Sequence, residues 1–170
     1  MKKYFICLLT IGLLLVICPP CYAQTGKMAI VGTWKLISIE LVDRKGNVIG
    51  PDEAFIGKNP TGLRIYDPNG YIMTQYMRLD PPVVTPPGSL QEIADAFGAC
   101  WAYFGTYEVK EMEGKEGKEG YVAHHVQGCI KPEDVGRAFI IKFKISGNHL
   151  ILTHMMYYRR YTLERVEKGE

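Results

Sequence analysis

The sequence predicts an all-β fold: an eight-stranded antiparallel up-and-down barrel with one short helix. Apolar and β-branched residues alternate with polar ones in repeated runs, short turns rich in Gly, Pro and Asn separate the runs, and helices do not alternate with them. Closing such a sheet removes its exposed edges and leaves room inside for side chains or one small ligand. The expected strands are Ile30–Asp43, Gly62–Tyr66, Tyr71–Arg78, Cys100–Lys110, Tyr121–Ile130, Arg137–Ile145, Leu150–Tyr157 and Tyr158–Val166.

The connections between the first strands differ in character. Asp67-Pro68-Asn69-Gly70 contains residues that each favour a tight turn, so it joins the second and third strands as a hairpin. Val48–Pro60 has glycines and prolines but no sustained period, and it is predicted to be irregular.

A helix is predicted over Ser89–Phe97, between the third and fourth strands. Ser89 and Glu92 have the spacing of a capping box, and apolar residues follow at helical intervals. The preceding segment, Leu79–Gly88, carries four prolines and is predicted to be a loop. Two roles are open for loop and helix together: a lid over the barrel mouth, or a plug that fills it.

The fourth and fifth strands flank the charged, glycine-rich loop Glu113–Gly120 and form the predicted central hairpin. Pairing them symmetrically about this loop places Gly105 opposite His124 and Cys100 opposite Cys129. The more aromatic face is expected to point inward, and it holds Trp101, Tyr103, Gly105, Tyr107, Val122, His124 and Val126.

The first 23 residues predict a Sec-type signal peptide, which leaves residues 24–170 as the barrel domain. Two lysines precede the apolar run Tyr4–Ile17, and small residues stand at the cleavage position after Ala23. The alternative, a permanent membrane anchor, is disfavoured because a spanning helix needs about 20 apolar residues. We therefore expect a periplasmic or secreted protein with no stable membrane anchor after cleavage.

Removal of that peptide would leave two of the five cysteines, Cys100 and Cys129. An oxidising compartment permits a disulfide between them, whereas free thiols would pack as small apolar groups; both outcomes are open. The formal net charge would change from +2 to 0, so charge gives no indication of a nucleic-acid partner. The sequence makes no prediction of oligomeric state.

Four ordered motifs resemble the lipocalin-like domain family of bacteria and fungi. They are Gly32-Thr33-Trp34; Gly62–Tyr66 followed by Gly70–Met73; Ala102–Val109; and His124-His125-Val126 followed by Pro132 and Val135-Gly136. The resemblance covers roughly residues 30–166, and it departs from the family pattern at Cys129, where a small hydroxyl residue is expected. It implies a calycin-like barrel with a central pocket, and a basic side chain, here Arg165, stacked on Trp34.

Polar groups that could orient a ligand are few. His124 lies between Tyr103 and Tyr107 on the predicted inner face, and it either binds a ligand or is a buried histidine held by a tyrosine hydroxyl. The predicted ligand-binding residues are Tyr103, Tyr107, His124, Tyr76, Gln75 and His154.

The sequence gives no indication of a cofactor or metal. It has no Gly-x-Ser-x-Gly elbow, and residues 24–170 contain no metal-ligand spacing of His or Cys. No catalytic residue is identified. Three hypotheses follow: an exported protein that binds a small hydrophobic or aromatic ligand, an isomerase or cyclase that uses the same pocket, and a packed barrel with a structural or interaction role.

Overall fold

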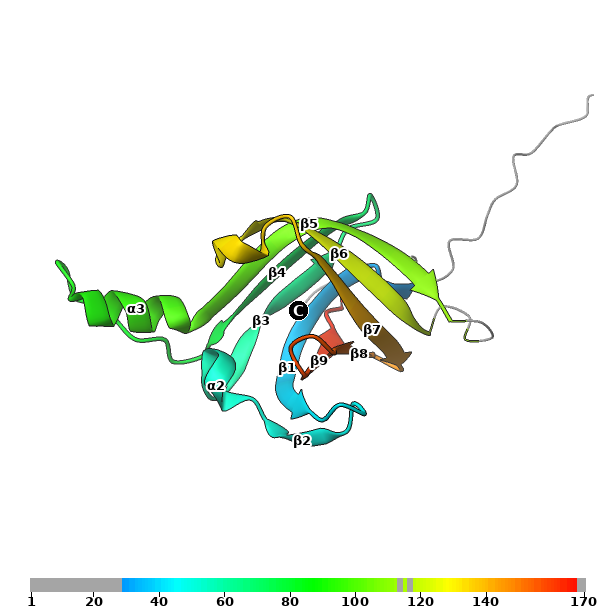
Figure 1. The fold of residues 1–170 in the computed structure, drawn as a ribbon, viewed down its shortest axis with the longest axis horizontal. Helices are drawn as coiled ribbons and strands as arrows, with labels where there is room; N and C mark the ends of the chain where they lie inside the picture. The colour runs from blue at the N-terminus through cyan, green and yellow to red at the C-terminus, as the bar shows by residue number, and fades with distance from the viewer. Residues whose placement is uncertain (1–28, 113–114, 116–117, 168–170) are drawn as a thin grey trace, which may run out of the picture.

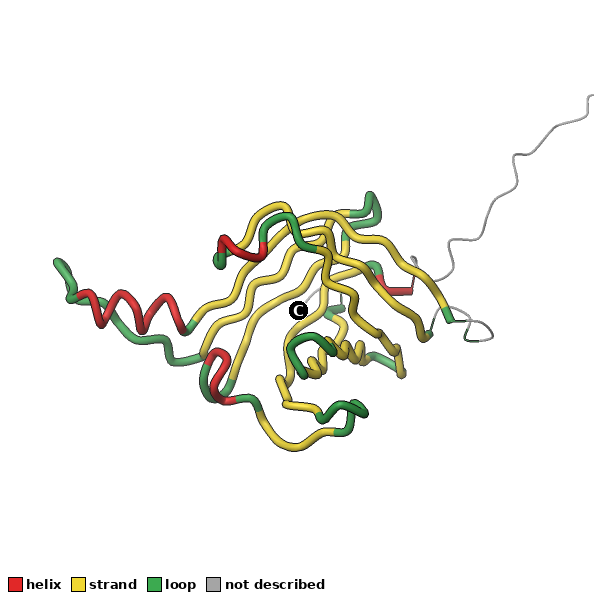
Figure 2. Tube along the Cα trace, in the orientation of Figure 1, coloured by secondary structure: helices red, strands yellow, loops and turns green. Residues whose placement is uncertain are grey.

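The computed structural model describes residues 29–112, 115 and 118–167. Strands dominate this part of the chain, and the few helices lie in the connections between them (Figures 1 and 2). The elements are β1 (Gly32–Val42), β2 (Val48–Pro51), α2 (Glu53–Ile56), β3 (Pro60–Tyr66), β4 (Tyr71–Arg78), α3 (Leu90–Gly98), β5 (Cys100–Glu111), β6 (Glu119–Cys129), the 3₁₀ helix η1 (Pro132–Asp134), β7 (Ala138–Ser146), β8 (His149–His154) and β9 (Arg159–Arg165). The predicted signal peptide lies outside the described residues.

Eight antiparallel strands close into a barrel, as the sequence predicts. β1 pairs with β3 on one side and with β9 on the other, and the strands between them pair in chain order. The prediction for Val48–Pro60 is wrong, because this segment forms β2 and α2. β2 pairs only with the second half of β1, where it adds a ninth strand outside the closed barrel.

One end of the barrel is closed by Trp34, which is fully buried at the start of β1. Its indole nitrogen donates to the carbonyl of Ile30 at 2.8 Å. The guanidinium carbon of Arg165 lies 4.0 Å from the Trp34 ring, and its nitrogens donate to the carbonyls of Ala29 and Val31. The predicted stacking of Arg165 on Trp34 is therefore confirmed.

The central hairpin forms, but with a register other than the predicted one. His124 faces Tyr107 instead of Gly105, and a bulge follows Phe104. A Cβ atom on Gly105 would lie 2.0 Å from the His125 carbonyl oxygen, so the close approach of the two strands there requires glycine. Because the shift along most of the hairpin is two residues, the predicted aromatic face still points inward.

The same register separates the two cysteines. Cys129 faces Tyr103, and Cys100 faces Met77 on β4. Both are free thiols in the structure, so the pairing on which the disulfide expectation rested does not occur.

Helix α3 begins with the predicted capping box, in which Ser89 and Glu92 each accept a hydrogen bond from the other's backbone amide. It extends away from the barrel (Figure 1), and none of its residues is buried. Leu90 is 87% exposed. In this structure the helix is therefore neither a lid nor a plug. Within the described residues, no helix is both long enough and apolar enough to span a membrane.

Candidate functional site

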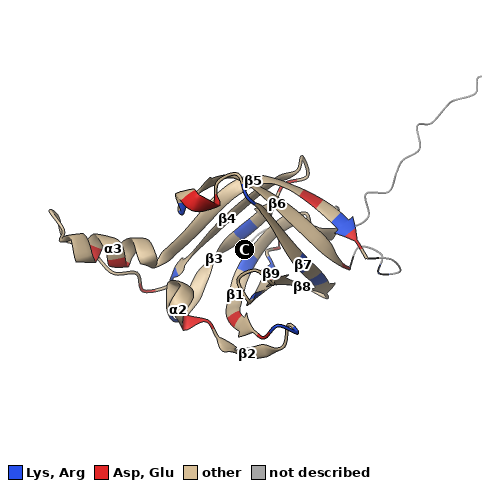
Figure 3. Cartoon of the chain, in the orientation of Figure 1, with Lys and Arg blue, Asp and Glu red and all other residues tan. Residues whose placement is uncertain are grey.

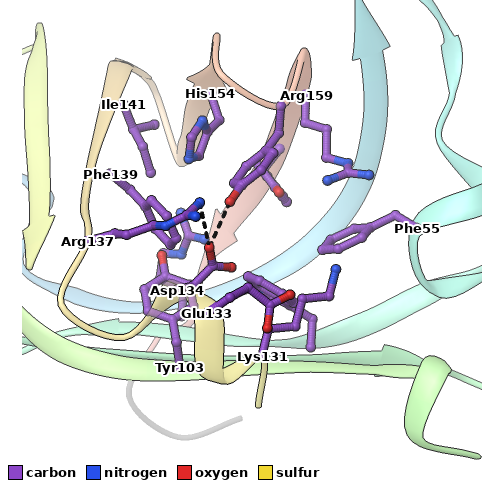
Figure 4. A pocket seen from close by; sticks show the side chains of 14 residues that line it. Phe55, Tyr103, Lys131, Glu133, Asp134, Arg137, Phe139, Ile141, His154 and Arg159 are labelled. Carbon is purple, nitrogen blue, oxygen red and sulfur yellow. Dashed lines mark hydrogen bonds and ion pairs between the residues drawn. The ribbon is translucent and has the colours of Figure 1, made fainter. Parts of the chain in front are cut away.

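A pocket of about 220 Å³ enters the barrel at the end opposite Trp34. β9 shows the two ends directly, because its first residue, Arg159, lines the pocket and its last, Arg165, covers Trp34. Fourteen residues line the pocket (Figure 4): Phe55, Arg64, Trp101, Tyr103, Lys131, Glu133, Asp134, Arg137, Phe139, Ile141, His154, Tyr157, Arg159 and Tyr161.

Aromatic side chains form much of the wall because inward positions of successive strands carry them. The ring of Phe139 meets Tyr103 edge-on, with centroids 5.7 Å apart, and Trp101 lies 6.2 Å from Tyr103 in a similar geometry. Phe139 also meets the His154 ring at 5.2 Å. Such edge-to-face contacts hold rings in fixed orientations, so the wall is preformed.

Charged groups surround the mouth, and most of them are paired. Asp134, on the acidic turn η1 (Figure 3), accepts from Arg137 at 3.2 Å and from the Tyr157 hydroxyl at 3.1 Å (Figure 4). Arg159 forms an ion pair with the buried Asp52, and its guanidinium carbon lies 3.9 Å from the Phe55 ring centroid. The hydrogen bond from Tyr157 ties η1 to the turn between β8 and β9, and the ion pair of Arg159 ties β9 to Asp52, just before α2. These two links hold the mouth in shape.

Arg64 lies deep in the pocket and is only 2% exposed. It stands on β3 directly opposite Thr74, whose hydroxyl accepts from Arg64 Nε at 3.0 Å. The guanidinium carbon lies 5.4 Å from the ring centroids of both Tyr76 and Tyr161. Its Nη1 is buried and has no hydrogen-bond partner among the described residues.

His154, at the end of β8, is the second buried polar group in the pocket wall and is 4% exposed. Neither of its ring nitrogens has a hydrogen-bond partner in the described part of the chain. Burial, reinforced by the positive charges of Arg64 and Arg159, lowers the pKa of His154 to about 4. The imidazole is therefore neutral at pH 7.

His124 lies behind the pocket wall and is fully buried. Its Nδ1 is 2.8 Å from the Tyr103 hydroxyl, and its Nε2 is 3.0 Å from the Tyr66 hydroxyl. Burial lowers its pKa well below the usual value, and the positive charge of Arg64 adds to this effect. A neutral imidazole has one donor and one acceptor nitrogen, so one tyrosine donates to His124 and the other accepts from it.

The predicted ligand-binding residues lie in four different places. Tyr103 and His154 line the pocket, while Tyr76 and His124 are buried beside it. Tyr107 lies toward the closed end, where its hydroxyl donates to the carbonyl of Asp67 at 2.8 Å. Gln75 is exposed on the outer face of β4, so its predicted place in the pocket is wrong: it neighbours the inward Tyr76, and alternate strand residues point to opposite faces.

Arg64 and the charged residues of the mouth are not among the site residues predicted from the sequence. In Gly62–Tyr66, hydrophobicity favours Leu63 and Ile65 as the inward residues, yet these two are 43% and 36% exposed. The alternation of Gly62, Arg64 and Tyr66 on one face was the available signal, because Tyr66 carries the larger aromatic side chain. Nothing in the sequence indicates that η1 contacts the turn between β8 and β9, where Tyr157 donates to Asp134.

No group of three or more His, Cys, Asp or Glu side chains that could hold a metal ion occurs among the described residues. A family profile described as a lipocalin-like domain matches residues 31–167. Searches of curated proteins and of solved structures each gave no significant match.

Proposed function

The chain belongs to the lipocalin-like domain family, and from that membership and its pocket we propose that it binds a small, largely apolar ligand inside the barrel. The observation that carries the proposal is the cavity of about 220 Å³ walled by aromatic rings. Binding sites for small molecules are typically preformed, mostly apolar and equipped with a few polar groups. A cavity of about 150 Å³ holds benzene, so this one suits a single ring with a short side chain.

The cavity favours binding over a packed barrel with a structural role. In a packed barrel the interior is filled by the chain's own side chains. Here Arg64 and His154 present nitrogen atoms at the cavity wall that have no hydrogen-bond partner among the described residues, which is the arrangement expected of groups that orient a ligand.

Native mass spectrometry of the protein purified from its own host tests the proposal. We expect a co-purifying molecule that is lost in Ile141→Phe, because Ile141 lines the pocket and a larger side chain would fill it. Ile140→Phe is the matched control, since the neighbouring Ile140 is exposed on the outer face. Equal retention of the molecule by both variants would place binding elsewhere and defeat the proposal.

A second candidate, an isomerase or cyclase, is favoured by the Tyr66–His124–Tyr103 hydrogen-bonded chain, which ends at a residue of the pocket wall. Such a chain can transfer a proton at the Tyr103 hydroxyl. His124→Ala separates the two functions with the co-purified molecule as substrate. Lost turnover with retained affinity would indicate catalysis, whereas weaker binding without turnover in the unaltered protein would indicate a carrier.

We also propose export to the periplasm or the medium, directed by residues 1–23. The N-terminal sequence of the protein recovered from those fractions would then begin at Gln24. Recovery of the protein from the cytoplasm with Met1 in place would contradict this proposal.

A further inference from the structure

We infer that the ligand carries a carboxylate, bound by Arg64 at the inner end of the pocket with His154 as a second donor. This inference rests on the proposed binding function and goes beyond it, because it specifies the charge and polar group of the ligand. It differs from the prediction made from the sequence, in which uncharged polar side chains such as Tyr103, Tyr107 and His124 orient a largely apolar ligand.

The first argument is the charge of Arg64. A guanidinium stays protonated in proteins, and a buried charge without a counter-ion is costly. No Asp or Glu of the described residues forms an ion pair with Arg64. The nearby hydroxyls do not neutralise it either, because burial raises the pKa of Tyr66, Tyr76 and Tyr161 and keeps them uncharged. An anionic ligand would supply the missing charge.

The other cations of the pocket wall show that this situation is particular to Arg64. Arg137 is paired with Asp134, and Arg159 with Asp52. Lys131 lies over the Trp101 ring at 5.2 Å, near the mouth. Only Arg64 combines near-complete burial, a place in the pocket wall and an unpartnered nitrogen within the described part of the chain.

The second argument is the type of polar atom that is left unpartnered. Arg64 Nη1 is a donor, and a neutral His154 offers one N–H donor as well. A carboxylate is an acceptor with two oxygens, so one group can accept from both side chains. A phosphate monoester carries nearly two charges, for which the wall offers a single unpaired buried cation.

The cavity size limits the remainder of the molecule to about one ring and a short chain. A series of equal skeleton and different charge tests the inference: 3-phenylpropanoate, 3-phenylpropan-1-ol and 3-phenylpropylamine. Binding at pH 7.5 can be measured by calorimetry and by the fluorescence of Trp101, which lines the pocket. We expect the acid to bind about 10- to 100-fold more tightly than the alcohol, and the amine most weakly.

Three variants assign this preference to Arg64. Arg64→Met should abolish the preference for the acid while the alcohol still binds, and Arg64→Lys should retain part of it because the charge is kept. Arg44→Gln, which removes a positive charge from an exposed turn, should leave the order unchanged. A circular-dichroism melt of each variant confirms that it is folded, and Arg64→Lys keeps the test valid if Arg64→Met does not fold.

The outcomes distinguish the inference from the function on which it rests. The inference that Arg64 binds a carboxylate would be overturned by equal binding of acid and alcohol in the unaltered protein, or by an acid preference that survives in Arg64→Met. Either result would leave the proposed binding pocket in place. Binding of none of the three probes, together with no co-purifying molecule, would overturn the proposed function and this inference with it.

Discussion

Arg165 and Arg64 each project from a barrel strand onto aromatic rings, yet their surroundings differ. Arg165 covers Trp34 at the closed end, and two of its nitrogens donate to backbone carbonyls at 2.8 Å. Arg64 is deeper and is flanked by Tyr76 and Tyr161, but one of its nitrogens has no partner among the described residues. The contacts of Arg165 are thus supplied by the chain itself, whereas Arg64 keeps a nitrogen that, within the described residues, is free to bind a ligand.

The difference suggests that the closed end of the barrel contributes to stability and that the pocket end binds a ligand. At the closed end, buried polar groups are satisfied by the chain itself, so they contribute to stability. At the pocket end, Arg64 and His154 are desolvated without full compensation, which costs stability unless a ligand supplies the partner. Four measurements test whether the two ends of the barrel differ in this way.

Truncating the tryptophan at each end should have unequal consequences. Trp34→Ala removes a fully buried ring from a packed site and should lower the free energy of unfolding by about 3–5 kcal/mol. Trp101→Ala should cost at least about 1 kcal/mol less, because Trp101 already borders a cavity and has fewer packing partners on that side. Urea denaturation measures both. An equal or larger loss of unfolding free energy for Trp101→Ala would contradict the view that the closed end contributes more to stability than the pocket end.

The pocket end should make the protein sensitive to acid. His154 has a pKa of about 4 in the folded protein, against about 6.5 in an unfolded chain, so only the unfolded chain binds its proton between these values. The free energy of unfolding should therefore fall as the pH falls from 7 to 4, by about 3 kcal/mol from this group.

Denaturant titrations at several pH values can test this effect. His154→Gln should flatten the decline between pH 6.5 and 4, and the exposed His149→Gln should leave it unchanged. A pH dependence that is identical in all three proteins would show that His154 is not held neutral by burial.

At the closed end, Arg165→Met should destabilise the protein by about 2 kcal/mol. The substitution removes the contact with the Trp34 ring and two hydrogen bonds to the carbonyls of Ala29 and Val31. Thermal and urea unfolding both report the loss. A change within about 0.5 kcal/mol would be typical of an ordinary surface residue and would show that Arg165 does not stabilise the closed end.

Arg64→Met should have the smallest effect on the ligand-free protein, within about 1 kcal/mol and in either direction. Loss of the hydrogen bond to Thr74 and of the two ring contacts opposes relief from an unpaired buried charge. The same urea titration, run on protein stripped of ligand by unfolding and refolding, measures the balance. A loss as large as that of Arg165→Met would mean that Arg64 is structural.

The architecture and the closed end can be predicted from local signals in the sequence. Alternation of side chains fixes which strands form, short turns fix their antiparallel order, and Ser89 and Glu92 fix the start of α3, because these signals act between near neighbours. The family motif predicts that Arg165 stacks on Trp34, as the structure confirms. For the pocket, two of the predicted residues, Tyr103 and His154, line the cavity.

The hairpin register, the position of α3 and the burial of Arg64 depend on contacts between distant parts of the chain. The hairpin register depended on a bulge at Gly105, and this bulge arises from the approach of two backbones. α3 has a helical pattern that does not reveal whether anything packs against it. Arg64 is inward because β3 must direct Tyr66 and Gly62 to the same side, and a charged residue on that face is buried whatever its hydropathy. Local pattern fixes the elements, whereas burial of a charge is a property of the closed barrel as a whole.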